Sequence, residues 1–395
     1  MEGLMADPAV CAISREEELH WLALTLIPGL GTRMAGKLLD RFRTPQAVFR
    51  ASRSELEAAG VSGAVAQSVA SGCSFEDALD QQRKMAERGA VAIVRSDPRY
   101  PALLREIFDP PILLFACGRL ELLQPFHFAV VGTRRPTPYG LAAAERLSAD
   151  LARAGLTIVS GMARGIDTAA HKGALSAGGD TVAILGCGVD IIYPSENRKL
   201  AADLSAKGLL LSEFAMGSTA FPQNFPIRNR IISGMSAGVL VVEGAQYSGS
   251  AITAKLALDQ GREVFAIPGN ITSKASWGPN LLIKQGAKLV QDWNDVIVEL
   301  PPEVRRQLIE RGRTRLLGNA GASQDGGQTS LIEGDLPEVG RRLLAVLQVD
   351  SAIHLDDLLQ IVEDSSPSEL IAALFELEML GLVKQLPGKN FVKVW

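Results

Sequence analysis

The sequence predicts an α/β protein built around a doubly wound, mostly parallel sheet, with helical regions at both ends of the chain. Short apolar runs alternate with amphipathic helical segments between residues 126 and 290. These runs are apolar along their whole length, which is typical of parallel strands covered by helices on both faces. The chain has 395 residues. That length is too great for one compact core and favours two or three domains.

Residues 1–85 are expected to form a helical domain, because short helical patterns follow one another from residue 15 to residue 70. Within them, the Pro-Gly-Leu-Gly turn at residues 28–31 joins two apolar-periodic segments, as in a helix-hairpin-helix element that contacts phosphate. A small helical domain with a solvated basic face is the other interpretation, and both stay open. The basic residues concerned are Arg33, Lys37, Arg41 and Arg43.

Residues 86–300 are expected to form the main domain, an extended Rossmann-like sheet. Apolar runs at 91–94 and 112–118 predict two extra strands that lead into this sheet. The main strands are predicted at 126–132, 156–161, 181–186, 209–213, 239–244 and 263–269. The amphipathic helices between them include 141–155, 167–178, 197–208 and 251–261.

The last part of the chain changes character. Residues 301–332 are charged, polar and glycine-rich, which predicts a flexible linker. Residues 333–395 carry three helical patterns and a hairpin, which is the make-up of a winged helix. Residues 331–395 have 5 basic and 11 acidic side chains. Contact with protein, or structural support, is therefore favoured there over contact with phosphate.

Composition argues against several classes of protein. Four cysteines lie far apart without a C-x-x-C pair and only four histidines are present, so neither a zinc site nor a disulfide framework is expected. A basic start followed by an apolar run is missing, and no stretch is long enough to span a membrane, so a cytoplasmic protein is expected. The net charge of −4 confines any nucleic-acid contact to a local patch.

Candidate binding residues follow the predicted strands, because ligands of open α/β sheets bind outside the carboxyl ends of the strands. The first main strand ends in Gly132, Thr133 and Arg134 before a helix, and this combination of amides, hydroxyl and fixed charge favours an anion. The second main strand ends in Ser160, which can donate to a phosphate, and Gly161, which permits close approach of the backbone. The G-x-G-x-x-G pattern of dinucleotide sites is missing, so no cofactor is expected.

Two further loops carry residues of the kinds that bind single strands. Phe225, Arg228, Asn229 and Arg230 stand at a helix start, where arginines suit phosphates and the aromatic ring suits a base. An ordinary helix start with arginines in solvent is the alternative. Ser250 follows the next strand, at another helix start that favours an anion. Several anion sites along one sheet edge suit a polymer better than a single nucleotide.

The loop motifs, taken in order, resemble the DNA-processing protein A (DprA/Smf) family of bacterial transformation and recombination. The motifs are VVGTRRPTPYG, SGMARGIDTAAHKGAL, FPIRNRIISGMS, VVEGAQYSGSAITA and IPGNITSKASWGPNLLIKQGA. They cover residues 126–290, and a lead-in segment extends the resemblance to residue 95. The first helices resemble the sterile-alpha-motif-like domain of that family, and the last region resembles its winged helix.

This resemblance implies a non-enzymatic recombination mediator. Such a protein binds and protects single-stranded DNA as a homodimer, and helps load the RecA recombinase in natural transformation. The DNA contacts that the resemblance implies are Arg134, Phe225, Arg228 and Arg230. Lys172 and Lys255 are added by position and charge. Nothing in the motifs locates the dimer or RecA surfaces.

Other functions fit the sequence less well. A nucleotide-cleaving hydrolase of the lysine-decarboxylase-like phosphoribohydrolase type uses a related sheet, but its P-G-G-x-G-T motif is not matched by residues 243–250. A dinucleotide-dependent oxidoreductase lacks its glycine fingerprint, and the acidic last region disfavours a winged-helix transcription factor. Asp167 and His171 have the spacing of a carboxylate and a base on one helix face. No nucleophile accompanies them, so a structural histidine is favoured.

Overall fold

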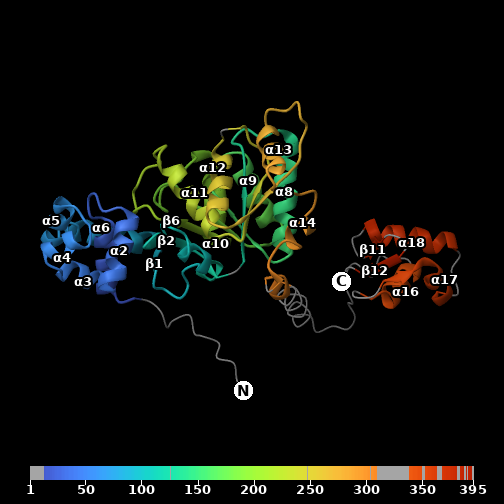
Figure 1. Cartoon of the computed structure of the whole chain (residues 1–395), viewed down its shortest axis with the longest axis horizontal. Coiled ribbons are helices and arrows are strands. Elements are labelled where there is room, and N and C mark those ends of the chain that lie inside the picture. The colour runs from blue at the N-terminus through green and yellow to red at the C-terminus, as the bar shows by residue number, and fades with distance from the viewer. Residues whose placement is uncertain are drawn as a thin grey trace, which may run out of the picture. The chain divides into compact units, whose positions relative to one another are not determined.

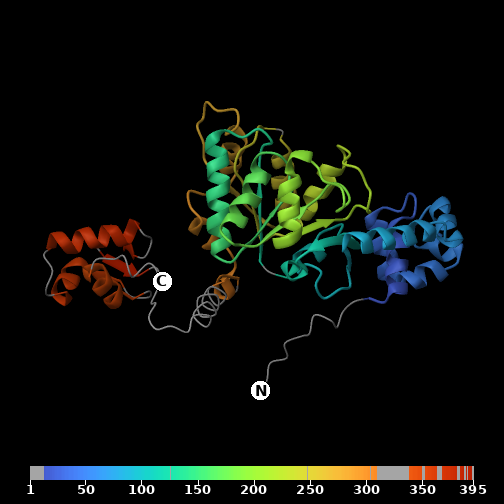
Figure 2. The same cartoon turned by 180° about the vertical axis from the view of Figure 1, so that it is seen from behind.

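The computed structural model describes residues 13–124, 126–246, 248–302, 304–308, 338–348, 352–362, 367–379, 383–386, 388 and 390–393 (Figures 1 and 2). The chain divides into two units, residues 1–316 and residues 317–395. Each unit contains its own hydrophobic core. Among the described helices, none combines the length and the apolar character needed to cross a membrane.

The described residues before the first strand are helical, as the sequence predicts. The helices are α1 (Arg15–Thr25), α2 (Thr32–Phe42), α3 (Pro45–Arg50), α4 (Arg53–Ala58), α5 (Gly63–Ser71) and α6 (Phe75–Arg88). Serine caps begin several of them; at α4, Ser52 and Glu55 form a capping box that satisfies exposed backbone N–H groups. Their apolar side chains share one core with Leu113 and Phe115 of the sheet. The domain boundary at residues 85 and 86 stays a prediction.

A nine-stranded sheet forms the centre of the first unit (Figure 1). Its order is β1-β2-β6-β5-β4-β3-β7-β8-β9. The strands are β1 (Val91–Val94), β2 (Leu113–Gly118), β3 (His127–Val131), β4 (Thr157–Ser160), β5 (Thr181–Ile184), β6 (Leu209–Ser212), β7 (Gly238–Val241), β8 (Glu263–Ala266) and β9 (Lys288–Leu289). The seven strands β6-β5-β4-β3-β7-β8-β9 are parallel to their neighbours. At one edge, β1 pairs antiparallel with β2, and β2 pairs antiparallel with β6. The predicted doubly wound sheet and its two extra strands are confirmed.

Helices cover both faces of the sheet, which explains why the central strands are apolar throughout. One face packs against α8 (Pro138–Arg153), α9 (Ile166–Ser176), α10 (Arg198–Lys207), α14 (Asn294–Ile297) and the N-terminal helices. The other face packs against α7 (Ala102–Arg105), the 3₁₀ turn η1 (Leu120–Leu123), α11 (Asn224–Gly234), α12 (Gly249–Asp259) and α13 (Trp277–Lys284). The chain winds from β3 to β6 in one direction and from β7 to β9 in the other, so a topological switch point lies between β3 and β7.

The second unit has the make-up of a winged helix. It contains α16 (Glu338–Val346), β10 (Ile353–His354), α17 (Leu355–Ile361), α18 (Pro367–Met379), β11 (Val383–Leu386) and β12 (Asn390–Lys393). The three strands form an antiparallel sheet in the order β10-β12-β11. Leucines from the three helices pack into the core of this unit. The predicted linker, residues 301–332, falls largely outside the described residues.

Candidate nucleic-acid interface

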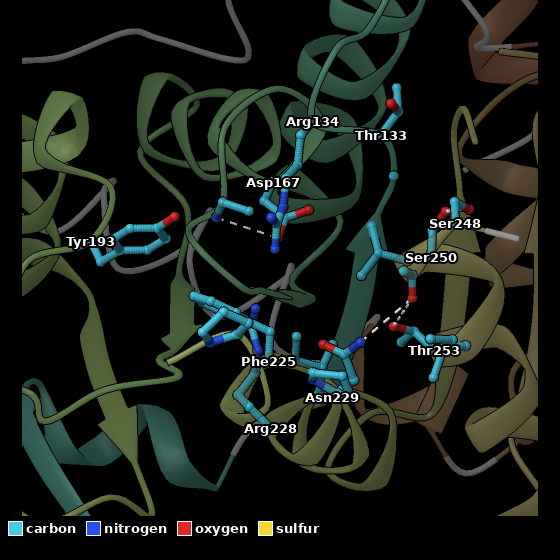
Figure 3. Close-up of a pocket in the computed structure, with 18 of the residues that line it drawn as sticks. Thr133, Arg134, Asp167, Tyr193, Phe225, Arg228, Asn229, Ser248, Ser250 and Thr253 are labelled. Carbon is cyan, nitrogen blue, oxygen red and sulfur yellow. Dashed lines mark hydrogen bonds between the residues drawn. The ribbon is translucent and has the colours of Figure 1, made fainter. Parts of the chain in front are cut away.

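One pocket opens at the switch point, at the carboxyl ends of the parallel strands (Figure 3). It is lined by the loops after β3, β4, β5, β6 and β7 and by the starts of α11 and α12. In this view Tyr193 and Ser250 stand on opposite sides, with Phe225 and Asn229 between them. The charged residues among the described lining are three arginines and one aspartate. The pocket is therefore a cationic groove; we call it the strand-end groove.

The loop after β3 brings Arg134 to the groove. Gly132 has no room for a side chain, because a Cβ there would lie 2.6 Å from Ile166 of α9. The backbone N–H of Thr133 donates to the carbonyl of Glu243 after β7, which ties the loop to the neighbouring strand. Arg134 itself is exposed, and its Cζ lies 5.1 Å from the centre of the Phe225 ring. The predicted residues Gly132, Thr133 and Arg134 thus all line the groove.

Glu243 is buried below this loop and holds the start of α8. Its carboxylate accepts from the Thr137 backbone N–H at 2.8 Å and from the Thr137 hydroxyl at 2.6 Å. Thr137 in turn caps α8 by accepting from the Gly140 N–H. Close packing fixes this arrangement, since a Cβ on Gly140 would lie 2.3 Å from Oε2 of Glu243. The carboxylate therefore acts as a structural anchor for the helix.

Arg228 lies beneath the floor of the groove rather than in solvent. It is 3% exposed, and its Nη1 donates to the carbonyl of Ile184 at 2.5 Å. Its Nε has no hydrogen-bond partner among the described residues. Burial lowers the pKa of Arg228 to about 10 and Asp167 opposes this shift, so the guanidinium stays protonated at neutral pH. The guanidinium therefore places a positive charge directly beneath the groove, which favours an anion there.

The loop after β4 makes space for this arginine. A Cβ on Gly161 would lie 1.9 Å from Nη1 of Arg228, so only glycine leaves the guanidinium its place. Asp167 accepts from the backbone N–H groups of Gly161 and Ala163. Burial raises the pKa of Asp167, and Arg228 opposes that shift. Asp167 thus organises the loop and supplies a counter-charge to Arg228.

Two aromatic rings form the wall beside the arginines. The rings of Phe225 and Tyr193 are 5.4 Å apart between centroids and inclined by 37°. Gly186 makes room for Phe225, because a Cβ there would lie 2.9 Å from the ring. Tyr193 is 42% exposed, whereas Phe225 is half-buried. An accessible aromatic surface beside cationic side chains suits a stacked base next to a phosphate.

The opposite wall is the start of α12. Ser248 caps this helix by accepting from the Ala251 N–H, and its hydroxyl lies 2.8 Å from that of Ser250. Asn229 of α11 reaches across, with its Nδ2 3.5 Å from the carbonyl of Gly249. Ser250 and Asn229, both predicted, therefore lie together in the groove with Phe225 and Arg228.

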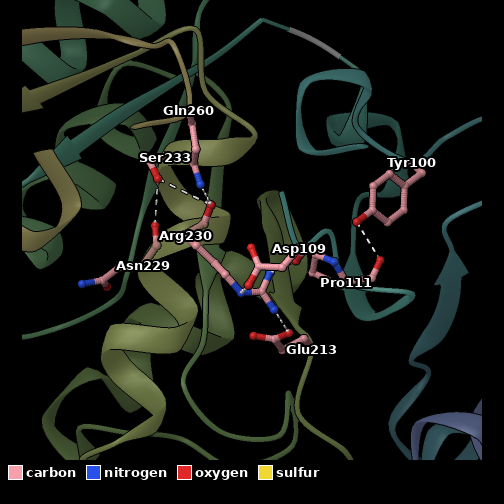
Figure 4. A network of polar contacts seen from close by, with 8 residues as sticks. All are labelled: Tyr100, Asp109, Pro111, Glu213, Asn229, Arg230, Ser233 and Gln260. Atoms are coloured by element: carbon pink, nitrogen blue, oxygen red, sulfur yellow. Dashed lines mark hydrogen bonds and ion pairs between the residues drawn. The ribbon is translucent and has the colours of Figure 1, made fainter. Parts of the chain in front are cut away.

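Arg230 does not reach the groove, although the sequence suggested a phosphate contact. It is buried in an ion pair with Glu213 and a second with Asp109, where its Nε lies 3.2 Å from Oδ2 (Figure 4). Its Nη1 also donates to the carbonyl of Asp109 at 2.8 Å. Burial raises the pKa of Glu213, and Arg230 opposes that shift. Arg230 joins α11 to two loops instead of facing the groove.

The remaining predicted residues are also outside the main lining. Lys172 on α9 and Lys255 on α12 are exposed, but neither lines the groove. Ser160 is buried, and its hydroxyl donates to the carbonyl of Val130 at 2.7 Å. Gly161 lines a small adjoining hollow with Arg164 and Tyr193.

His171 has the structural setting that the sequence favoured. Its Nδ1 lies 2.7 Å from the hydroxyl of Thr181, and burial lowers its pKa to about 3. The ring is therefore neutral at physiological pH, and its bonded partner is Thr181 instead of Asp167.

Sequence reasoning missed several lining residues, including Tyr193, Arg135, Ser248 and Thr253. Tyr193 stands in the segment between β5 and α10, beyond the loop residues that directly follow the strand. The signal that points to it is an aromatic residue followed by proline in a strand-end loop.

Comparison with known proteins gives a consistent picture. The family model described as DNA recombination-mediator protein A matches residues 91–301, and that of the DprA winged helix domain matches residues 332–389. Protein Smf of Synechocystis sp. is 32% identical over 96% of this chain and 99% of its own length. Protein Smf of Escherichia coli is 40% identical over 73% of this chain and 74% of its own length.

A solved structure is similar over most of the chain. The X-ray structure of DNA processing protein A from Streptococcus pneumoniae superposes with a TM-score of 0.62 and 34% sequence identity. The superposition covers 73% of this chain and 99% of the Streptococcus pneumoniae chain. The similarity extends well beyond the groove.

Proposed function

This chain belongs to the DNA recombination-mediator protein A family, and from that premise we propose that its strand-end groove binds single-stranded DNA. The observation that carries the proposal is the composition of the groove. Arg134 is exposed beside Phe225 and Tyr193, Arg228 supplies a buried positive charge below them, and hydroxyl groups line the opposite wall. Phosphates bind such cationic and hydroxyl groups, while bases stack on the rings.

Substitution of the groove arginines tests this proposal. Arg134→Ala and Arg228→Ala are expected to weaken binding to single-stranded oligonucleotides of all sequences, because phosphate contacts carry no base information. The slope of log affinity against log salt should fall by about 0.7 for each phosphate that the variant no longer neutralises. Fluorescence anisotropy at several salt concentrations measures both quantities. Arg146→Ala is the matched control, since Arg146 is a largely exposed arginine on α8 that does not line the groove.

Phe225 gives a test of stacking. Phe225→Ala is expected to weaken binding by about 1 to 3 kcal/mol if a base stacks against this aromatic pair. The salt slope should stay at the wild-type value, because no charge is removed. Wild-type affinity in the Arg134, Arg228 and Phe225 variants together would contradict the proposal.

We further propose that the protein acts on DNA by binding, without catalysis. Glu243, the carboxylate nearest to the position expected in a phosphoribohydrolase, is held by two hydrogen bonds from Thr137. It is buried rather than presented to a substrate. Incubation with nucleoside monophosphates should therefore release no free base. Clear turnover by the wild type that disappears in Glu243→Ala would establish an enzyme instead.

The family resemblance supports a wider role. We propose that the protein is a cytoplasmic homodimer that protects single-stranded DNA and helps load RecA during natural transformation. Light scattering of the full chain gives its oligomeric state. Addition of the protein to RecA and DNA coated with single-strand-binding protein should shorten the lag before RecA filaments form. An unchanged lag alongside normal DNA binding would limit the function to DNA protection.

A further inference from the structure

The loop between β6 and α11, residues 213–223, connects the groove to the rest of the first unit. Ala220 and Pro222 of this loop line the groove, and the chain continues from it into Phe225 of α11. Near its start, Glu213 forms the buried ion pair with Arg230. The position of this loop therefore determines where the Phe225 ring lies in the groove.

Gln81 of α6 holds the middle of this loop. Its Nε2 donates to the carbonyl of Met216 at 3.2 Å, and its Oε1 accepts from the Met216 N–H at 2.7 Å. Both residues are buried, so neither backbone group of Met216 has solvent to replace a missing partner. One side chain from the N-terminal helices thus satisfies both backbone groups of a residue 135 positions away.

The next residue of the loop, Gly217, is held by a different segment of the chain. The Gly217 N–H lies 2.9 Å from each carboxylate oxygen of Asp190. Asp190 belongs to the segment that leads to Tyr193, the exposed aromatic residue of the groove. Gly217 has a φ of +82°, a left-handed conformation that suits glycine. The Met216–Gly217 pair therefore links α6, the Tyr193 segment and the Phe225 helix.

We propose that α6 positions the aromatic wall of the groove, and that Gln81 is the positioning residue through which it acts. This inference rests on the proposed binding of single-stranded DNA. It gives the N-terminal helices a role in that binding without any DNA contact of their own. Gln81 orders residues 213–223 in the conformation that seats Phe225 beside Tyr193.

The size of the effect follows from the two hydrogen bonds. Removal of both leaves two buried backbone groups without a partner, and the loop then spends part of its time in other conformations. Apparent affinity falls in proportion to the fraction of molecules with the loop in place. With net values near the middle of the usual range for each of the two hydrogen bonds, the expected loss is at most roughly thirtyfold in Kd. The salt slope is unchanged, because every phosphate contact remains available.

Gln81→Met in the full chain tests the inference, because methionine keeps the buried volume and removes both hydrogen bonds. Gln82→Met is the matched control. Gln82 is equally buried on the same helix, but its Nε2 donates to the carbonyl of Arg15 and the carboxylate of Glu18, both within the N-terminal helices. Two quantities are measured: the affinity for a single-stranded oligonucleotide, and hydrogen exchange at residues 213–225.

The expected result is weaker binding and faster exchange at Met216 and Gly217 in Gln81→Met only. Equal affinity in the wild type and Gln81→Met would overturn the inference, as would an equal loss in both variants, which would indicate general destabilisation. If the wild type itself bound no single-stranded DNA, the proposed function would fall. Exchange at residues 213–225 would then still decide whether α6 orders the loop, and unchanged exchange would overturn that claim as well.

Discussion

At the scale of single residues, Gly161 and Arg228 act as a pair. The missing side chain of Gly161 is the space in which the Arg228 guanidinium sits, since a Cβ would lie 1.9 Å from Nη1. The Gly161 backbone and the buried Arg228 guanidinium thus pack directly against each other. Any side chain at position 161 would therefore have to displace the guanidinium.

Gly161→Ala is therefore expected to displace Arg228. Overpacking of this kind lowers the free energy of unfolding by about 1 to 3 kcal/mol, and the affinity for single-stranded DNA should fall as well. Urea unfolding and anisotropy measure the two effects. Gly36→Ala is the control, since Gly36 lies inside α2 and its Cβ would meet only the flexible Arg95 side chain at 3.4 Å. Its affinity should be preserved, and its free energy of unfolding should rise by up to about 1 kcal/mol, because alanine favours a helix over glycine. A Gly161→Ala variant with wild-type affinity would show that Arg228 has room elsewhere.

Two buried histidines make stability depend on pH. Burial lowers the pKa of His127 to about 4 and that of His171 to about 3, below the ordinary value of 6.5. Below pH 6.5 the unfolded chain binds protons that the folded chain does not, so stability is lost as the pH falls towards these lowered values. Each histidine should contribute a slope of about 1.4 kcal/mol per pH unit in that window.

Urea unfolding of the wild type and His171→Gln, from neutral pH to about pH 4.5, checks this expectation. The variant should lose the contribution of one histidine to the slope, whatever its stability at neutral pH. Parallel pH profiles for the two proteins would mean that His171 takes up its proton in the folded state.

At the scale of elements, α11 separates two arginines that the sequence places close together. Arg228 and Arg230 are two positions apart, which is a rotation of about 200° around a helix. One therefore faces the groove while the other faces the loops that hold Asp109 and Glu213. Helical geometry alone allowed only one of them to line the groove, and the motif by itself did not indicate which.

Arg230→Leu is expected to destabilise the fold rather than remove a DNA contact. Breaking a buried ion pair leaves the carboxylate of Glu213 without its partner, at a cost of about 3 to 5 kcal/mol. Thermal unfolding should show the loss, and the double variant Arg230→Leu with Glu213→Leu should recover part of it. Under conditions where Arg230→Leu is folded, its salt slope should equal that of the wild type. A slope reduced as in Arg134→Ala would return Arg230 to the DNA contacts.

The strands and their loops were predictable from sequence, whereas the burial of polar side chains was not. Runs such as residues 239–242 are apolar throughout, and that pattern is enough to place a covered parallel strand. The loops and helix starts that follow such strands gather at one edge by topology, which is why Arg134, Asn229 and Ser250 lie in one groove. Whether a lysine on α9 or α12 reaches that edge depends on helix rotation. The exposed Lys172 and Lys255 do not line it.

At the scale of the whole molecule, the charge is distributed unevenly. The chain carries a net charge of −4, yet three of the four charged residues among the described lining of the groove are arginines. Residues 331–395 carry more than twice as many acidic as basic side chains. We therefore expect attraction for DNA to be local to the groove, and the charge of residues 331–395 does not favour a contribution from the winged-helix unit.

Removal of residues 317–395 is accordingly expected to leave the affinity for single-stranded DNA and its salt slope unchanged. All described residues that line the groove lie between Val131 and Thr253, and the two units have separate cores. Anisotropy measurements on the truncated and full chains test this directly. Arg134→Ala in the truncated chain should weaken binding as much as it does in the full chain. If truncation alone weakened binding by roughly tenfold, a difference of about 1.4 kcal/mol, the acidic unit would have to support the groove or the DNA through contacts other than charge.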